Sequence, residues 1–122
     1  MARLIIKGKL PGLNEYIEAE RRNRYKGAAM KRESEAIVAW GIKASRLKPF
    51  SKAVVMRYRW FEKDKRRDKD NVSSFGRKVI QDALVKMKIL KGDGWNYIEG
   101  FSDEFYIDKT DPRIEVEIEE AE

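Results

Sequence analysis

Residues 52 to 62 constrain the fold of this chain more than any other segment, because their side chains alternate in polarity. The apolar positions on one side of this segment are Val54, Met56, Tyr58 and Trp60. Arg57 and Arg59 fall between them. Successive side chains of a β-strand point to opposite faces of its sheet, so the alternation predicts a strand with one buried and one solvated face.

Two longer stretches have the period of amphipathic helices, from about residue 28 to 46 and from about 71 to 88. The apolar residues of the first stretch are Ala29, Ala36, Ile37, Trp40 and Ala44. Those of the second stretch are Val72, Phe75, Val79, Ile80, Ala83 and Met87. On the second predicted helix, Ser74, Lys78 and Asp82 form a stripe beside the apolar face.

Shorter apolar runs predict the other strands, the first of which is residues 3 to 7. A loop is predicted after it, and this loop carries Pro11, Gly12, Asn14 and Tyr16. Residues 101 to 108 and 114 to 119 predict a pair of closing strands. The order strand, helix, strand, helix, strand, strand predicts a small α/β fold of the α+β kind. We expect a single domain over residues 1–122, with a mixed sheet and helices packed mainly on one face.

The composition excludes several classes of site. The chain of 122 residues has no cysteine and no histidine, which excludes disulfides, thiol or histidine nucleophiles and the usual zinc sites. Carboxylates and lysines remain as the reactive groups, so any metal ion would be bound by oxygen. No apolar run approaches the roughly 20 residues of a membrane span, and no signal peptide is visible, so we expect a cytoplasmic protein without a membrane partner.

Charge is divided unevenly along the chain. Residues 1–91 carry 25 Lys and Arg against 10 Asp and Glu, whereas residues 92–122 carry 2 against 11. A basic segment of this kind favours a polyanionic partner, and nucleic acid is the commonest one. The alternative is that the two sets of charges pair across the fold as a solvated surface.

Asp68 and Asp70 stand directly after a basic run, residues 63 to 67, and just before the second predicted helix. A surface built only to bind phosphates would lose affinity with each added carboxylate. A divalent cation such as Mg²⁺ would remove this conflict, because two carboxylates can hold it together with water and substrate phosphate. Alternatively, Asp68 is an ion-paired loop residue and Asp70 or Asn71 caps the helix.

Two further positions are candidates for the same site. Asp93 lies between Gly92 and Gly94 in a predicted tight turn, where little shields its carboxylate. Lys78 lies one helical turn before Asp82, although this spacing is also that of an ordinary surface ion pair.

The run from Arg66 to Asn71, Arg-Arg-Asp-Lys-Asp-Asn, is followed by Lys78, then Asp82-Ala83-Leu84, then Asp93. Residues 10 to 14, Leu-Pro-Gly-Leu-Asn, precede it near the N-terminus. In this order of motifs the chain resembles the RusA-type Holliday-junction resolvases, and the resemblance covers most of its length.

The resemblance implies a small homodimer that binds four-way DNA junctions and nicks opposing strands symmetrically, in recombination, repair or phage DNA processing. Mg²⁺ is the implied cofactor, and Mn²⁺ is an expected substitute. By the resemblance Asp68, Asp70 and Asp93 are the metal ligands and Lys78 is the active-site lysine. We expect Asp82 to orient Lys78.

Two features depart from the family pattern. The stretch between Asn71 and Lys78 is longer by about one helical turn, which keeps the same helix face. Gly92 and Asp93 stand where the family has two adjacent Asp residues, so fewer carboxylates and a weaker metal affinity are expected.

The resemblance and the charge pattern also give candidate DNA contacts. The candidates are Arg21, Arg22, Arg24, Arg57, Arg59, Lys65, Arg66, Arg67, Lys69 and Asn71. Phosphate contacts position DNA without reading its bases, so a preference for junctions is expected from DNA shape and from the spacing of two sites in a dimer. Trp95 and Tyr97 either stack on an unpaired base or anchor their turn to the core.

Three functions follow as hypotheses. The first is a Mg²⁺-dependent endonuclease for branched DNA, the second is a basic DNA-binding or structural module without turnover, and the third is a flap- or RNA-directed nuclease. Convergence of Asp68, Asp70 and Asp93 in an exposed basic groove would favour an enzyme. Separate salt bridges would favour a binding module.

Overall fold

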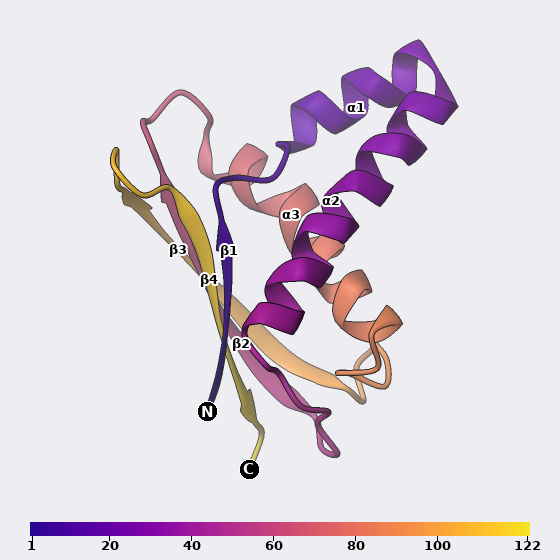
Figure 1. Cartoon of the computed structure of the whole chain (residues 1–122), viewed down its shortest axis with the longest axis vertical. Helices are drawn as coiled ribbons and strands as arrows, with labels where there is room; N and C mark the ends of the chain where they lie inside the picture. Colours follow the sequence, from indigo (N-terminus) through magenta and orange to yellow (C-terminus); the bar gives the residue numbers. More distant parts are fainter.

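The structure, a computed structural model, describes all residues from Met1 to Glu122. Its strands are β1 (Ala2–Lys7), β2 (Val54–Glu62), β3 (Ile98–Ile107) and β4 (Arg113–Glu120). Its helices are α1 (Leu13–Arg22), α2 (Arg24–Ala44) and α3 (Lys69–Lys86). All three helices lie on the same side of the sheet in Figure 1. The predicted single-domain α+β class with a mixed sheet is confirmed. None of the helices combines the length and the hydropathy that crossing a membrane requires.

The sheet has the order β1-β4-β2-β3, in which β4 is antiparallel to both of its neighbours and β2 is parallel to β3. The predicted pairing of residues 101–108 with residues 114–119 is therefore wrong, because β2 separates these segments. Burial explains the order. Ile114, Val116 and Ile118 of β4 are at most 3% exposed, as a central strand requires, whereas much of β3 remains accessible to solvent. The C-terminal strand thus completes the centre of the sheet.

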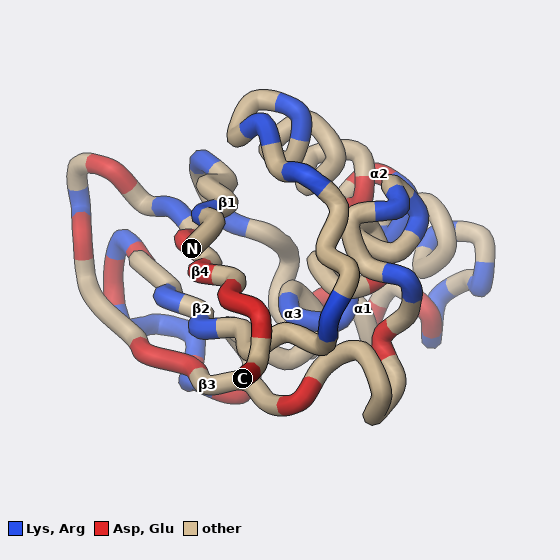
Figure 2. The backbone as a smooth tube through the Cα atoms, turned by 90° about the horizontal axis from the view of Figure 1, so that it is seen from below, with Lys and Arg blue, Asp and Glu red and all other residues tan.

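The predicted alternation of β2 is confirmed. The side chains that face the core, each at most 1% exposed, are Val54, Met56, Tyr58 and Trp60. On the outer face Arg57 pairs with Glu119 at 3.1 Å, and Arg59 lies between Glu104 of β3 and Glu117 of β4. Figure 2 shows how basic positions of β2 and acidic positions of β3 and β4 alternate across the sheet. The charges that are separated along the sequence therefore pair across this face.

The segment around Asn14 and Tyr16 forms helix α1, so the prediction of a loop there is wrong. Gly12 caps the helix, and its N–H donates to the Glu15 carboxylate at 3.2 Å. Tyr16 stacks on Phe75 of α3 with ring centroids 4.4 Å apart. A helix of ten residues is marginal by itself, so this packing against α3 stabilises it.

Helix α2 begins earlier than predicted and buries a different face. Ile37 and Trp40, which belong to the predicted apolar stripe, are 44% and 71% exposed. The buried residues of the helix are Gly27, Ser34, Val38, Gly41 and Ile42. A Cβ atom added at Gly41 would lie only 3.0 Å from the Ile5 carbonyl oxygen. At this position the helix backbone approaches β1 too closely for a larger side chain, so a glycine is required there.

Candidate functional site on helix α3

Asp68 is the N-cap of α3. Its Oδ1 accepts a hydrogen bond from the Asn71 backbone N–H at 2.8 Å, which satisfies one of the free donors at the helix N-terminus. The capping alternative from the sequence therefore applies, but to Asp68 rather than to Asp70 or Asn71. The Oδ2 atom of Asp68 has no hydrogen bond within the chain, so one carboxylate oxygen remains free for a ligand.

Arg67 and Asn71 hold the start of α3 to the N-terminal part of the chain. Arg67, whose side chain is 14% exposed, donates two hydrogen bonds of 3.0 Å to the Glu62 carboxylate and one to the Leu10 carbonyl. The Asn71 Oδ1 accepts from the backbone N–H of Asn14 in the first turn of α1. Both residues were candidates for DNA contacts, and the structure gives them partners inside the protein instead.

Asp70, Ser74, Lys78 and Asp82 form a continuous polar line along α3, which we call the α3 stripe. The Ser74 hydroxyl donates to the Asp70 carboxylate at 2.8 Å. One turn further, the Lys78 ammonium pairs with Asp82 at 3.0 Å. Residues four positions apart on a helix are neighbours, so the predicted stripe of Ser74, Lys78 and Asp82 is confirmed, and Asp70 extends it by one turn.

Asp93 reaches the α3 stripe from outside the helix. Its Oδ2 lies 2.8 Å from the Lys78 Nζ, although the two residues are 15 positions apart. Gly92 lets the Tyr97 ring pack against this turn, because a Cβ atom there would lie only 2.7 Å from the ring. The hydrogen bond from the Lys78 ammonium holds the pKa of Asp93 below its ordinary value of 3.8, and the carboxylates of Asp93 and Asp82 raise the pKa of Lys78 above its ordinary value of 10.5.

Lys31 of α2 also contacts these charged side chains, although no sequence pattern indicates it. Its ammonium lies 3.0 Å from Asp82, on the carboxylate oxygen that Lys78 does not contact. Asp82, only 17% exposed, is therefore shared by two lysines. No pattern within α2 marks Lys31, because its partner lies on another helix.

Arg77, which no sequence pattern indicates either, positions α3 against β3. Arg77 donates to Asp103 at 2.6 Å, and its guanidinium lies 4.7 Å from the centre of the Phe101 ring. The other oxygen of Asp103 accepts from the indole N–H of buried Trp60. Arg77 thus fixes the rotation of α3, which directs the neighbouring Lys78 toward the turn that carries Asp93.

The three predicted metal ligands do not gather in one chain. No group of three or more acidic side chains in the structure could hold a metal ion. Asp70 and Lys78 stand about 12 Å apart along the helix axis, and Asp93 lies at the Lys78 end. The carboxylate oxygens suit Mg²⁺ by their chemistry, but their arrangement within one chain does not fit a single ion shared by all three.

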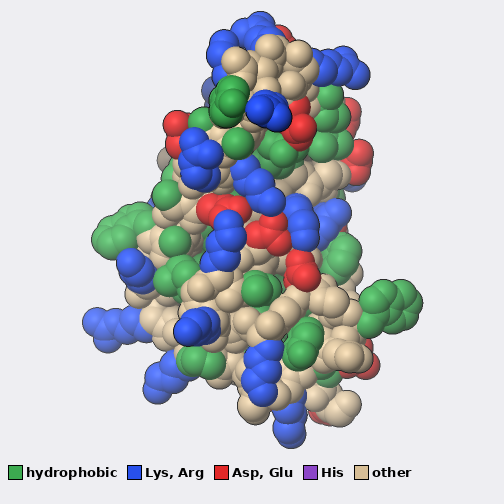
Figure 3. Space-filling view, turned by 90° about the vertical axis from the view of Figure 1, so that its right-hand side faces the viewer, with side chains coloured by type: hydrophobic (Ala, Val, Ile, Leu, Met, Phe, Trp, Pro, Cys, Tyr) green, Lys and Arg blue, Asp and Glu red, His purple; other side chains and the backbone are tan.

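The candidate DNA contacts fall on separate surfaces. Arg57 and Arg59 lie on the outer face of the sheet and pair with glutamates. Arg21, Arg22 and Arg24 lie at the junction of α1 and α2, which forms the upper end of the helical face in Figure 3, where Lys and Arg side chains gather. The helices cover the other face of the sheet, so these two groups lie on opposite sides of it.

A third basic group lies at the start of α3. Lys65, Arg66 and Lys69 stand on or beside the loop between β2 and α3. Arg66 pairs weakly with Asp64 at 3.6 Å, and the Lys69 ammonium lies 5.7 Å from the centre of the Phe105 ring. Lys65 and Lys69 line a groove of about 610 Å³ that also includes Asp68. This is the only candidate group that adjoins one of the predicted acids.

Trp95 and Tyr97 differ in their surroundings. Trp95 is 98% exposed and anchors nothing to the core. Tyr97 is 39% exposed and packs against Gly92, so it supports the turn that carries Asp93. The anchoring alternative therefore applies to Tyr97, whereas Trp95 is free to contact a partner.

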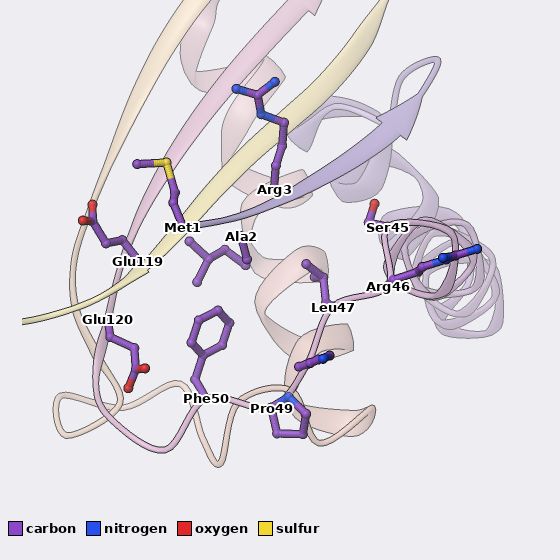
Figure 4. Close-up of a pocket in the computed structure, with 12 residues that line it drawn as sticks. Met1, Ala2, Arg3, Ser45, Arg46, Leu47, Pro49, Phe50, Glu119 and Glu120 are labelled. Carbon is purple, nitrogen blue, oxygen red and sulfur yellow. The ribbon is translucent and has the colours of Figure 1, made fainter.

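A further groove, of about 670 Å³, lies between the start of β1, the end of β4 and the segment after α2. Figure 4 shows Phe50 among the side chains around this groove, with Arg3, Arg46 and Glu119 around its rim. It contains none of the predicted site residues. The α3 stripe with Asp93 therefore remains the candidate site.

Comparison with known proteins adds no assignment. The chain matches no protein-family model, and a search among curated proteins finds no match.

Proposed function

We propose that this protein is a metal-dependent endonuclease of the RusA type that acts on branched DNA. The observation that carries the proposal is the contact between Lys78 and Asp93. The motif order singled out these two residues from separate parts of the chain, and their charged groups lie 2.8 Å apart on an accessible surface. Asp70 stands on the same helix line as Lys78. Perturbed titratable groups that meet at a surface are typical of functional sites.

Lys78 would bind a non-bridging oxygen of the target phosphate and stabilise the charge that develops there during cleavage. Asp93 and Asp82 support this role, because both raise the pKa of Lys78 and keep it charged at any physiological pH. When bound, Mg²⁺ would supply positive charge and an activated water. Asp68 and Asp70 each offer oxygen atoms for it at the start of α3.

The proposed substrate is a four-way junction, and the proposed active form is a homodimer. A two-fold dimer presents two equal sites, which matches the two-fold shape of a junction and paired nicks in opposing strands. The basic side chains at the start of α3 would hold the backbone beside the acids. A flap or an RNA structure would engage the same groups, so competition between substrates is part of the test.

A second candidate function is a DNA-binding module without turnover. The specific observation in its favour is that the acids have partners inside the chain. Asp82 pairs with two lysines, Asp93 pairs with Lys78, and Asp68 caps α3. In this reading the acids stabilise the fold, and only the basic groups contact DNA.

One experiment separates these functions. A labelled four-way junction, a linear duplex, a flap and a structured RNA are incubated with Mg²⁺ and either wild type or Asp70→Asn, with binding measured in the same samples. We expect symmetric nicks in the junction by wild type only, and equal or tighter binding by Asp70→Asn, because a negative charge is removed.

Asp64→Asn is the matched control, since it removes a carboxylate from the same basic loop outside the α3 stripe and should cleave normally. Junction binding by wild type without any nicking would overturn the nuclease and support the binding module. Loss of binding by Asp70→Asn would count against its place in the site.

A further inference from the structure

Six exposed residues form a line along α2, which we call the outer stripe. They are Tyr25, Ala28, Arg32, Ala36, Trp40 and Lys43. Each is three or four positions from the next, a spacing that keeps side chains on one face of a helix. The residues that α2 buries, such as Ser34 and Val38, lie on the opposite face. The outer stripe therefore points away from the sheet.

Two aromatic side chains of the outer stripe are open to solvent. Trp40 is 71% exposed and Tyr25 is 69% exposed. The Arg24 guanidinium lies 5.2 Å from the centre of the Tyr25 ring, so one aromatic group already has a cation against it. Aromatic rings offer large flat apolar faces, and these two are free to stack on a partner.

Cations alternate with the aromatic side chains along the outer stripe. Arg32 lies between the two rings, about 10 Å along the helix axis from the first and about 12 Å from the second. Lys43 lies one turn beyond the second ring. Neither cation forms an ion pair, whereas Lys31, on the side of α2 that faces α3, pairs with Asp82. Arg32 and Lys43 are therefore available to bind an anion.

Two carboxylates lie beside the outer stripe, which itself contains none. Glu35 pairs with Lys86, and its side chain is only 12% exposed. Glu33 is exposed and lies on the side of α1, where it lines a groove together with Glu15 and Glu18. Glu33 is thus the one unpaired acid that would reduce the attraction of the outer stripe for a polyanion.

We propose that the outer stripe of α2 binds single-stranded nucleic acid. Tyr25 and Trp40 would stack on unpaired bases, and Arg32 and Lys43 would contact the phosphates of the same strand. A duplex keeps the faces of its bases stacked inside, so it could engage the cations but not the rings. The two alanines of the stripe leave room for a strand to approach the helix. DNA and RNA share this chemistry.

Tryptophan fluorescence tests where the strand binds. Trp60 is only 1% exposed, so in a Trp95→Phe protein Trp40 is the one accessible tryptophan. Oligothymidylate and oligouridylate of about 16 nucleotides, the upper end of common site sizes, should quench its emission by stacking. The stronger quencher identifies DNA or RNA as the better ligand. Quenching of Trp95 alone, seen in a Trp40→Phe protein, would overturn the placement on α2.

The affinity of substituted proteins for the same oligonucleotides gives an independent check. Trp40→Ala should weaken binding about tenfold, the usual effect of losing one stacked base. Ile37→Ala is the matched control, because Ile37 is an exposed apolar residue of the same helix that lies outside the outer stripe. Both variants should keep the circular dichroism spectrum of the wild type. Equal affinities of the two variants would overturn the stacking.

The salt dependence of binding tests the phosphate contacts. Arg32→Gln and Lys43→Gln should each reduce the slope of log affinity against log salt concentration by about 0.7, the value for one contact to a single strand. Lys109→Gln, which removes an exposed cation between β3 and β4, should leave the slope unchanged. Glu33→Gln should tighten binding, because it removes the unpaired acid beside the outer stripe. An effect of Lys109→Gln as large as that of Arg32→Gln would show that binding is not confined to α2.

This inference does not depend on the proposed endonuclease, because no residue of the α3 stripe takes part in it. A protein that binds the oligonucleotides through α2 but nicks no junction would overturn the endonuclease and support the binding of single strands. A protein that nicks junctions but binds neither oligonucleotide would overturn the present inference. The exposed rings of α2 would then belong to an interface with another protein.

Discussion

At the scale of single residues, Lys78 is the centre of the charged cluster. It contacts Asp82 and Asp93, and each contact shifts a pKa in the direction that keeps the ions charged. Asp93 has a lowered pKa in the folded state, so its contribution to stability is present above pH 3.8 and is lost as the pH falls through the lowered value. Lys78 has a raised pKa, so its contribution is present below pH 10.5 and is lost above the raised value. The charges of Lys78 and Asp93 therefore do not change across the physiological pH range.

Replacing Lys78 by Met should raise the pKa of Asp93 toward its ordinary value of 3.8, because the hydrogen bond from the ammonium is the main cause of the shift. The pKa is measured by following the Asp93 carboxyl carbon in an NMR titration. Lys86→Met is the control. It removes an exposed lysine of the same helix that pairs with Glu35, so the pKa of Asp93 should not change. An unaltered Asp93 titration in Lys78→Met would show that the two side chains are not in contact in solution.

Asp68 combines a cap with a proposed ligand, and the two roles can be separated. Asp68→Ser keeps a side-chain oxygen for the Asn71 N–H and should cost little stability, whereas Asp68→Ala should lose about 1 kcal/mol in urea unfolding. Both variants lack the carboxylate, so both should lose junction cleavage. A stable Asp68→Ser protein that cleaves normally would restrict Asp68 to its capping role.

At the scale of elements, the junction of α1 with α3 depends on a close approach at Gly12. A Cβ atom there would lie 2.6 Å from the Asn71 Oδ1 and 3.1 Å from the Arg67 guanidinium. Both side chains are fixed by their own hydrogen bonds, to Asn14 and to Glu62 and Leu10. Gly12 is thus required by packing, since its φ angle of −81° is accessible to other residues.

Gly12→Ala should therefore destabilise the protein by about 1–3 kcal/mol, the usual range for overpacking a fixed site. Chemical denaturation followed by circular dichroism measures the change. Gly94→Ala is the matched control, because a Cβ atom added at Gly94 meets nothing within 4 Å. Equal stability of the two variants would mean that Asn71 and Arg67 move aside easily.

At the scale of the whole molecule, the C-terminal strand holds the sheet together. Strand β4 lies between β1 and β2, and its apolar side chains are at the centre of the core. Its glutamates also neutralise the arginines of β1 and β2, as in the pairs Arg3–Glu117 and Arg57–Glu119. Without β4, the first strand has no partner in the sheet.

Deletion of residues 113–122 should abolish folding, because it divides the sheet and exposes the core. Deletion of residues 121–122 is the control, and it should leave the fold intact since these residues follow the end of β4. Dispersion of amide signals in an NMR spectrum distinguishes the outcomes. A folded protein after the longer deletion would contradict the central position of β4.

Local periodicity in the amino-acid sequence is enough to predict several features of this fold. The alternation of β2, the apolar face of α3 and the spacing of Lys78 and Asp82 follow from the geometry of a strand and a helix, and the structure has all three. The motif order also selected Lys78 and Asp93, which the structure places in contact. For the strand and the helix the neighbouring residues carry the information, whereas Lys78 and Asp93 were selected by the resemblance to a family.

Which segments meet depends instead on packing between elements that are distant in the sequence. Strand β4 entered the centre of the sheet because its alternate side chains demand burial on a covered face, and no local pattern specifies its partners. Helix α1 depends on the stacking of Tyr16 on Phe75, and α2 places Gly41 against β1 because the two backbones approach closely there. The separation of Asp68 and Asp70 from Asp93 has the same origin. Asp68 and Asp70 lie at the start of α3, and Asp93 lies in the turn between α3 and β3. The position of α3 against β3 is set by packing contacts such as that of Arg77 with Asp103.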